Sequence, residues 1–209
     1  MILSFDIGIK NLSYCVMYKD ETYDSINKNN IKIFDWGIIQ LIEDEVKCKG
    51  VPLDKITKVL YDILYNKFIE YDITKVLLEN QPVLKNPVMK SIQMIIYGYF
   101  SYEKNIMGRE IENIKLINAS NKLKLGKNLQ DINNSEDILK IKSKYTRNKK
   151  LAILYTNHFL KQRLIVEDYD KYNDIFNNHK KKDDLADAFL QGLWVLNNNY
   201  NLTINYKHS

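Results

Sequence analysis

The sequence predicts an α/β fold, in which a mixed five-stranded sheet of three antiparallel strands followed by parallel strands is flanked by helices. Three short strand-like segments come first, with no helical pattern between them. Helical and strand-like segments then alternate, which is the order of parallel strands joined by helical crossovers. The 209 residues, 45% of them hydrophobic, suffice for one core. We therefore expect one domain over residues 1–209.

The first three strands are expected over residues 1–7, 12–18 and 31–41. The first is a short apolar run that contains Asp6, and the other two are rich in aromatic and β-branched side chains, which favour strands. Residues 24–30 are polar and rich in asparagine, as suits a hairpin connection. These segments predict an antiparallel meander.

A helix and a fourth strand come next. Asp54 is expected to cap a helix whose apolar positions recur every three or four residues as far as Phe68. Residues 74–78 are too few for a helix and indicate a buried strand that ends at Glu79.

The second half of the chain continues the alternation. After a turn marked by Pro82 and Pro87, residues 88–102 have helical periodicity, and residues 114–117 indicate a fifth strand. Residues 118–137 are polar and are expected to form a loop insertion with little helix. Two more helices and a frayed tail are expected over residues 145–160, 183–197 and 197–209.

The composition excludes several classes of protein. Two cysteines, Cys15 and Cys48, are too few for a disulfide framework or a thiolate zinc site. The three histidines lie too far apart for a local metal-binding box. No stretch approaches the roughly 18 apolar residues of a membrane span. The chain opens without a signal or transit peptide, so we expect a reducing, intracellular compartment.

The positive charge is concentrated in one segment. The net charge is only +5, but residues 138–163 hold eight basic side chains and no acidic one. A basic segment beside acidic ones suggests a polyanion held on one face. A solvated, lysine-rich helix face explains the charge equally well.

Four carboxylates stand at the ends of the predicted elements. Asp6 lies in the first strand and Glu79 ends the fourth, and these strands are neighbours in any sheet built from this order. Asp184 and Asp187 are three residues apart, on one face of the last helix. Carboxylates gathered in a partly buried cleft repel one another unless cations neutralise them. An oxygen-only set of ligands favours Mg²⁺ or Mn²⁺.

Each acid also has a purely structural explanation. Asp6 suits a turn, and Glu79 suits a polar position at a turn or helix. Asp183 and Asp184 suit the first turn of a helix, where acids complement the helix dipole. Asp187 is harder to explain in this way, because it lies within an apolar stretch of the helix.

Three segments in combination resemble one known family. Residues 4–12 (SFDIGIKNL), 78–81 (LENQ) and 182–188 (KDDLADA) resemble the RuvC-like Holliday junction resolvases of poxviruses and other large DNA viruses, within the retroviral-integrase/RNase H superfamily. The fungal mitochondrial resolvases are the next most similar. The first segment alone is shared with actin-like kinases and is weak by itself. The resemblance implies an RNase H-like sheet and a homodimer that cuts four-way DNA junctions symmetrically with Mg²⁺.

The resemblance also implies roles for individual residues. The metal ligands of the family fall on four acids, Asp6, Glu79, Asp184 and Asp187. Asp183 lies one helical turn from Asp187, so only the family's spacing favours Asp184. Relatives use a catalytic lysine in the helix before the last one. Lys150 fits that place, with Lys149 close behind, and the alternative is that both belong to a phosphate-binding surface.

The implied chemistry is hydrolysis by two Mg²⁺ ions per active site, which Mn²⁺ could replace, without a small-molecule cofactor. One ion activates the attacking water and the other neutralises the leaving oxygen. Basic side chains would hold DNA phosphates without reading the sequence. The candidates in the basic segment are Lys140, Lys142, Lys144, Arg147 and Lys149, with Lys150, Lys161 and Arg163 beside them and Lys122, Lys124 and Lys127 in the polar loop.

The expected partners are branched DNA and a second copy of the chain, because paired cuts call for a symmetric dimer. No membrane partner is expected. The helix over residues 87–102 is the candidate dimer interface, although packing on the sheet explains its apolar face equally well. The viral resemblance implies replication sites in a host cytoplasm. The alternative functions are another nuclease of the superfamily, acting on flaps or RNA–DNA hybrids, a catalytically silent DNA-binding relative, and an actin-like kinase.

Overall fold

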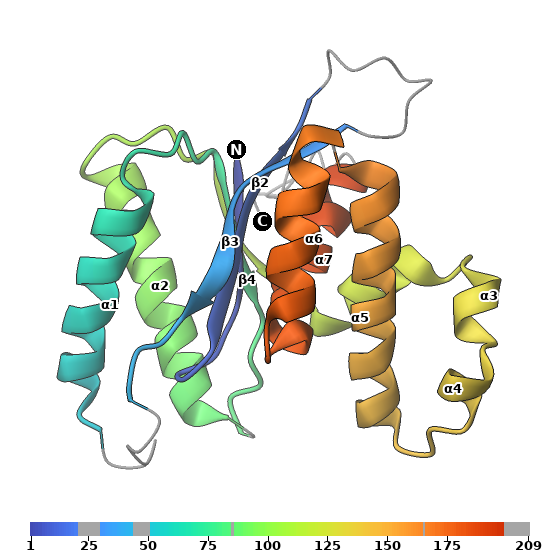
Figure 1. The fold of residues 1–209 in the computed structure, drawn as a ribbon. Helices are drawn as coiled ribbons and strands as arrows, with labels where there is room; N and C mark the ends of the chain where they lie inside the picture. Colours follow the sequence, from blue (N-terminus) through green and yellow to red (C-terminus); the bar gives the residue numbers. More distant parts are fainter. Residues whose placement is uncertain (21–29, 44–50, 85, 165, 199–209) are drawn as a thin grey trace, which may run out of the picture.

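A central sheet with helices on both faces forms the computed structural model of the protein (Figure 1). The structure describes residues 1–20, 30–43, 51–84, 86–164 and 166–198. The connection expected over residues 24–30 and the tail expected over residues 197–209 lie almost wholly outside the described residues. Among the described residues, no helix is both long and apolar enough to cross a bilayer.

The five strands confirm the predicted mixed sheet. They are β1 (Ile2–Asp6), β2 (Leu12–Lys19), β3 (Ile31–Ile39), β4 (Lys75–Glu79) and β5 (Asn113–Ile117). Their spatial order is β3-β2-β1-β4-β5. The pairs β1–β2 and β2–β3 are antiparallel, whereas β4 runs parallel to β1 and β5 parallel to β4. The first strand of the chain is therefore the central strand of the sheet.

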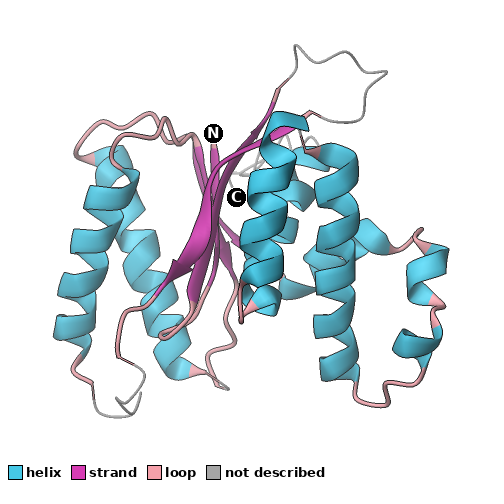
Figure 2. Ribbon diagram, viewed as in Figure 1, coloured by secondary structure: helices cyan, strands magenta, loops and turns pink. Residues whose placement is uncertain are grey.

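Two helices, α1 (Leu53–Phe68) and α2 (Pro87–Asn105), cover one face of the sheet (Figure 2). Their apolar stripes pack on side chains of β1 and β4, with Phe5 in edge-to-face contact with Phe68. Pro87 is the first residue of α2, where its missing N–H costs no hydrogen bond. The prediction that Asp54 caps α1 is wrong, since Pro52 holds that position and Asp54 lies within the first turn.

The other face carries most of the remaining chain. Its helical elements are η1 (Ala119–Gly126), α3 (Gln130–Asn133), α4 (Glu136–Leu139), α5 (Lys144–Arg163), α6 (Val166–Asn178) and α7 (Lys182–Asn197). The helix in closest contact with the sheet is α7, in which ten of the eleven residues from Leu185 to Val195 are buried, all except Asp187. A helix so apolar on every side must be covered by sheet and helices together.

Two segments differ from the sequence prediction. Residues 118–137, expected as a loop, contain η1 and two single-turn helices. The helix α6 was not expected, because its sequence is largely polar; among the side chains that the structure describes in it, only Tyr172 and Phe176, four residues apart, are fully buried. Phe176 stacks on Trp36 of β3 with ring centroids 5.4 Å apart. Contact with the sheet, rather than amphipathic periodicity along the whole helix, therefore holds α6 in place.

Candidate active site

The pleat of the sheet places two acids on the same face. Phe5 of β1 and Leu78 of β4 are paired across the two parallel strands and both point into the core under α1 and α2. Successive side chains of a strand point to opposite faces. Asp6 and Glu79, the next residue in each strand, therefore both point to the α7 face, side by side at the carboxyl end of the central strands.

The helix α7 adds a third carboxylate to this pair. It begins beyond the edge of the sheet at which β1 and β4 end, and it packs across β1 and β2 (Figure 1). Asp187 lies just over one turn into the helix. One carboxylate oxygen from each of Asp6, Glu79 and Asp187 lies within 4.8 Å of the other two. Three of the four predicted metal ligands therefore meet at one point.

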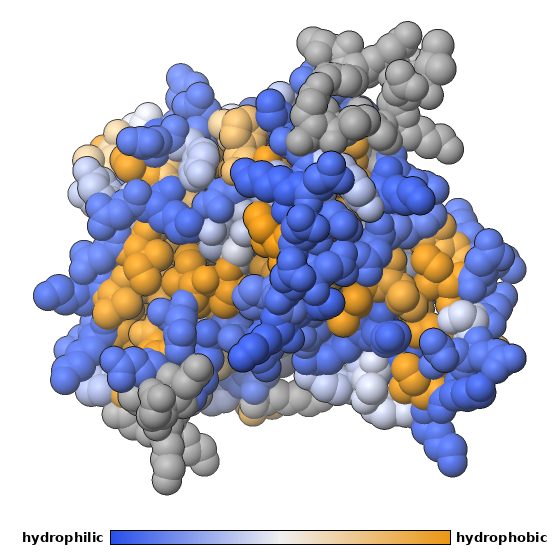
Figure 3. Space-filling model, in the orientation of Figure 1, coloured by the Kyte–Doolittle hydropathy of each residue, from blue (hydrophilic) through white to orange (hydrophobic). Residues whose placement is uncertain are grey.

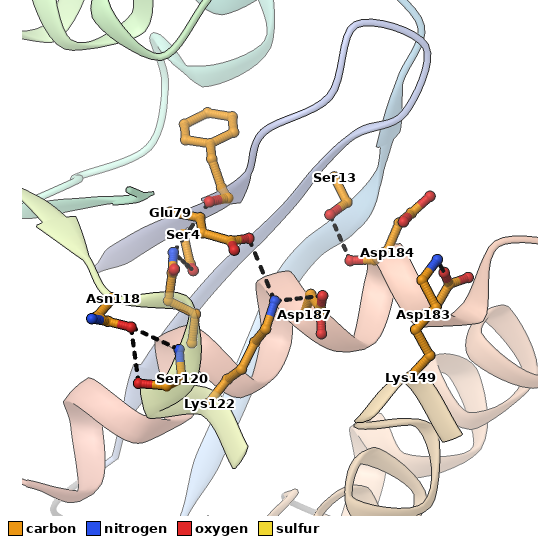
Figure 4. Close-up of polar contacts among 12 residues, drawn as sticks. Ser4, Ser13, Glu79, Asn118, Ser120, Lys122, Lys149, Asp183, Asp184 and Asp187 are labelled. Carbon is orange, nitrogen blue, oxygen red and sulfur yellow. Dashed lines mark hydrogen bonds and ion pairs between the residues drawn. The ribbon is translucent and has the colours of Figure 1, made fainter. Parts of the chain in front are cut away.

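The fourth predicted ligand, Asp184, lies beside this cluster. Together with Asp6, the turn over residues 7–11 and Met89, it lines a cavity of about 290 Å³. Asp183 points away, toward α5, where it forms an ion pair with Lys149 (Figure 4). The spacing of the acids left Asp183 and Asp184 open, and the geometry favours Asp184 because it shares a cavity with Asp6.

A lysine lies among the three clustered carboxylates. Lys122 extends from η1, with its Nζ 3.4 Å from Glu79 Oε2, and forms an ion pair with Asp187 (Figure 4). Only 12% of the Lys122 side chain is exposed. In this structure Lys122 is therefore paired with the clustered acids and is not part of an exposed basic surface. The sequence carried no signal for this position, because η1 was not predicted and Lys122 is one of several lysines in a polar stretch.

Asp6 and Glu79 behave as a coupled acid pair. Burial raises the pKa of Asp6 well above its usual value, and its hydrogen bond and charge repulsion with Glu79 raise it further. Burial also opposes ionisation of Glu79, but the hydrogen bond with Asp6 and the positive charge of Lys122 outweigh it, so the pKa of Glu79 is lowered. Within the pair, protonation is therefore favoured on Asp6 over Glu79.

Asp187 and Lys122 form the second half of the cluster. Burial raises the pKa of Asp187 to about 6, although the adjacent Lys122 ammonium favours its charged form. Burial lowers the pKa of Lys122, but the carboxylates of Asp187, Asp6 and Glu79 outweigh this effect and raise it above its usual value. The lysine is therefore always charged at neutral pH.

This set of donors fits a divalent cation. Carboxylate oxygens are the ligands that Mg²⁺ and Mn²⁺ prefer, and the cluster contains no sulfur or imidazole donor among the described residues. The Lys122 ammonium shows that the cluster already holds a positive charge between Glu79 and Asp187. Asp6, Glu79 and Asp187 could hold such an ion, and Asp184 lies across the adjacent cavity from Asp6.

The lysines predicted to act from α5 differ in their contacts and exposure. Lys149 contacts Asp183 of α7, and its Nζ lies 5.1 Å from the centre of the Tyr145 ring. Lys150, the first choice for a catalytic lysine, is exposed on α5. Of the other predicted DNA contacts, Lys140, Lys142 and Lys144 are exposed and Arg147 is half-buried.

The fold can be compared with known structures. A five-stranded sheet in the order β3-β2-β1-β4-β5, flanked by helices, is the RuvC-like form of the RNase H fold. Residues 2–93 match the family described as mitochondrial resolvase Ydc2 / RNA splicing MRS1. The match agrees, over residues 2–93, with the predicted resemblance to the RuvC-like Holliday junction resolvases, and the solved structures below share the fold.

Two solved resolvases share this fold over nearly the whole chain. The yeast mitochondrial Holliday junction resolvase Ydc2 superposes with a TM-score of 0.64 at 18% identity, over 93% of this chain and 78% of that one. Fowlpox virus resolvase, solved with Holliday junction DNA, superposes with a TM-score of 0.57 at 22% identity, over 95% of this chain and 99% of that one.

A viral protein is similar in sequence. The uncharacterized protein L451 of Acanthamoeba polyphaga mimivirus is 35% identical over 192 residues, which are 88% of this chain. The aligned part is 42% of the mimivirus protein, so this chain spans less than half the length of its viral relative.

Proposed function

We propose that this protein is a structure-selective endonuclease that resolves four-way DNA junctions by paired, metal-dependent phosphodiester hydrolysis. The observation that carries the proposal is the meeting of Asp6, Glu79 and Asp187, from β1, β4 and α7, within 4.8 Å of one another around a buried ammonium. The match of residues 2–93 to a resolvase family supports the junction as the substrate.

The acids would hold Mg²⁺, or Mn²⁺ in its place, with two ions per site. A bound divalent ion would supply an activated water and neutralise charge on the departing oxygen. The role of the protein would be to hold four carboxylates at fixed positions on rigid elements, namely Asp6, Glu79, Asp184 and Asp187. It also keeps them poorly solvated, which strengthens their attraction for a cation. Asp6, on the central strand and next to the cavity, would be among the ligands.

A lysine would stabilise the negative charge that grows on the phosphate in the transition state. We propose Lys122 for this role in place of Lys150. Lys122 is held at the carboxylates by η1, whereas Lys150 is exposed on α5. Lys122 lies between Glu79 and Asp187, and it would be available to a bound phosphate if these two acids held a cation in its place.

The DNA would lie across the edge of the molecule at which α5 and α7 begin. Figure 1 shows the amino ends of both helices at this edge, below the ends of β1 and β4. The exposed Lys142 and Lys144 stand at the start of α5, with Lys149 one turn further along. Contacts of this kind bind phosphates of any sequence and weaken as salt increases.

A homodimer would place two such sites at a fixed separation, so that a branch point fits and a plain duplex does not. The helix α2 is our candidate interface. Its exposed side chains include Val88, Met94 and Tyr102. Figure 3 shows hydrophobic side chains gathered over the part of the surface formed by α1 and α2.

One assay tests the proposal. The protein is incubated with a synthetic four-way junction, a duplex, a flap and an RNA–DNA hybrid, each with Mg²⁺ and with EDTA. We expect paired, ligatable nicks on the junction alone, and only with Mg²⁺. Cleavage confined to the hybrid or the flap would identify another nuclease of the same fold. Binding without cleavage under all conditions would identify a catalytically silent relative.

A further inference from the structure

The helix that carries Asp184 and Asp187 is joined to the sheet by three side-chain contacts. Ser13 of β2 donates to the main-chain oxygen of Asp184, and Trp36 of β3 donates to that of Leu185. One turn beyond Asp187, the helix supplies the donor instead: Gln191 donates to Ser4 of β1. The contacts thus lie on both sides of Asp187 along the helix.

Ser13 connects the first turn of α7 directly to the strand pair that carries Asp6. It is the residue opposite Asp6 in the β1–β2 ladder, and it is fully buried. Its Oγ lies 2.6 Å from the main-chain oxygen of Asp184 (Figure 4). A carbonyl oxygen has two lone pairs, so this bond does not compete with the hydrogen bonds of the helix. The bond fixes the distance between the residue facing Asp6 and the backbone of Asp184.

Gln191 makes the corresponding contact with β1 itself. Its Nε2 lies 3.0 Å from Ser4 Oγ and 3.1 Å from the main-chain oxygen of Phe5, the residue before Asp6. Only 2% of Gln191 is exposed and none of Ser4. A buried amide is retained only where its hydrogen bonds are satisfied, so this geometry leaves Gln191 little freedom to move.

The approach of α7 to the sheet is close at the same place. A Cβ atom added at Gly192 would lie 3.0 Å from the Met17 side chain and 3.4 Å from Ser4 Cβ. An aspartate side chain is short, so Asp187 reaches Asp6 and Glu79 only if the helix backbone stays this near. The clustered carboxylates repel one another, which would push the helix outward.

We propose that Ser13 and Gln191 are positioning residues that fix the register of α7 on β1 and β2 and thereby set the affinity of the acid cluster for its metal ion. This inference rests on the proposed function, because it takes the cluster to be a metal site. Neither residue touches metal or DNA. Each acts through the position of Asp184 and Asp187.

The test measures metal binding without DNA cleavage. Ser13→Ala and Gln191→Met each remove the donor at nearly constant volume, and Mn²⁺ binding is followed by calorimetry or by the electron paramagnetic resonance signal of free Mn²⁺. We expect the Kd for Mn²⁺ to rise about tenfold in each variant, the equivalent of one net buried hydrogen bond. We also expect a high Mg²⁺ concentration to restore the cleavage rate of both variants, because their acids are intact.

The matched control is Arg109→Met, at the far end of the sheet. Arg109 donates to the main-chain oxygens of Phe68 and Tyr71, so its loss lowers stability without touching α7. We expect this variant to melt at a lower temperature and to bind Mn²⁺ as the wild type does. If Ser13→Ala and Gln191→Met behaved like the control, the positioning role would be refuted. If the wild type itself bound no Mn²⁺, the metal site would be refuted first, and the positioning role with it.

Discussion

Asp187 is a largely buried carboxylate whose charge lowers the stability of the metal-free protein, although the proposed metal site needs that charge. Burial raises its pKa from 3.8 to about 6, so the folded protein retains a proton that the unfolded chain gives up between these values. The stability that this proton contributes is complete below about pH 4 and is lost as the pH rises through about 6. At neutral pH the metal-free protein therefore carries an unfavourable buried charge, which a metal ion would relieve.

Asp187→Asn is expected to abolish cleavage and to leave junction binding almost unchanged, because it removes a proposed metal ligand and no phosphate contact. In EDTA at pH 7 it should raise the free energy of unfolding by up to about 3 kcal/mol, since a neutral amide replaces the buried carboxylate. Nicking assays, binding assays in EDTA and denaturant unfolding measure the three effects. Asp183→Asn, on the same helix, is the control and should still cleave. Joint loss of folding and binding in Asp187→Asn would show a structural role instead.

Lys122→Met is expected to destabilise the metal-free protein, because it leaves the carboxylates without their counter-ion. Addition of Mg²⁺ should restore most of the lost thermal stability, while turnover at saturating Mg²⁺ stays lower by about 10² or more. Thermal unfolding with and without Mg²⁺ and single-turnover cleavage test both statements. Lys124→Met, an exposed neighbour that lies over the Trp194 ring, is the control. Wild-type turnover in Lys122→Met would exclude a catalytic role.

Metal affinity is expected to rise with pH between about 5 and 7. Asp187, with a pKa of about 6, and Asp6, whose pKa is also raised, must both be ionised before the cluster can bind a cation fully. Titration of Mn²⁺ at several pH values measures the slope. The Asp187→Asn variant should bind more weakly and show a flatter dependence. A flat profile in the wild type would mean that these carboxyls are not ligands.

At the scale of the elements, two neighbouring lysines of α5 differ in their surroundings. Lys150 is exposed, whereas Lys149 is tied to Asp183 of α7. We expect Lys150→Ala to weaken junction binding and to reduce the steepness of its salt dependence, with little effect on turnover once the DNA is bound. Binding measured over a range of salt concentrations, beside single-turnover rates, separates the two effects. A fall in turnover by orders of magnitude would restore Lys150 as the catalytic lysine.

The elements that the sequence predicted well are those whose residues share one environment. Short apolar runs bounded by polar turns located all five strands within two residues of their bounds. The helix α6 was not predicted, because two aromatic side chains anchor an otherwise polar segment. The element η1 was not predicted, because a polar stretch with lysines is typical of a loop. Nothing in the sequence shows that one of these lysines contacts buried acids.

The acids of the site were predictable for a different reason. Asp6 and Glu79 interrupt or end apolar strands, and Asp187 interrupts an apolar helix, so each carries an unfavourable charge that calls for a partner. The partner found in the structure is Lys122. It lies 43 positions after Glu79 in the chain, so the contact between the two is a long-range one. Such a contact follows from the three-dimensional path of η1 and not from any local pattern.

At the scale of the whole molecule, the paired cuts that we propose call for a dimer. Met94→Glu places a charge on the apolar surface of α2, where 47% of the methionine side chain is exposed. If α2 is the interface, we expect a monomer in sedimentation experiments and single nicks in place of paired cuts on the junction. Lys104→Glu, near the end of the same helix, serves as a charge control. A variant that stays dimeric and makes paired cuts would locate the interface elsewhere.

The long reach of the contacts around α7 has a consequence for the newly made protein. Ser13 and Asp184 are 171 positions apart, and Gln191 and Phe5 are 186 apart. A ribosome that has made only the sheet has therefore produced Asp6 and Glu79 but not the helix that carries Asp187. Nascent and prematurely ended chains consequently lack the third carboxylate, so the nuclease activity that we propose would arise only when translation reaches α7.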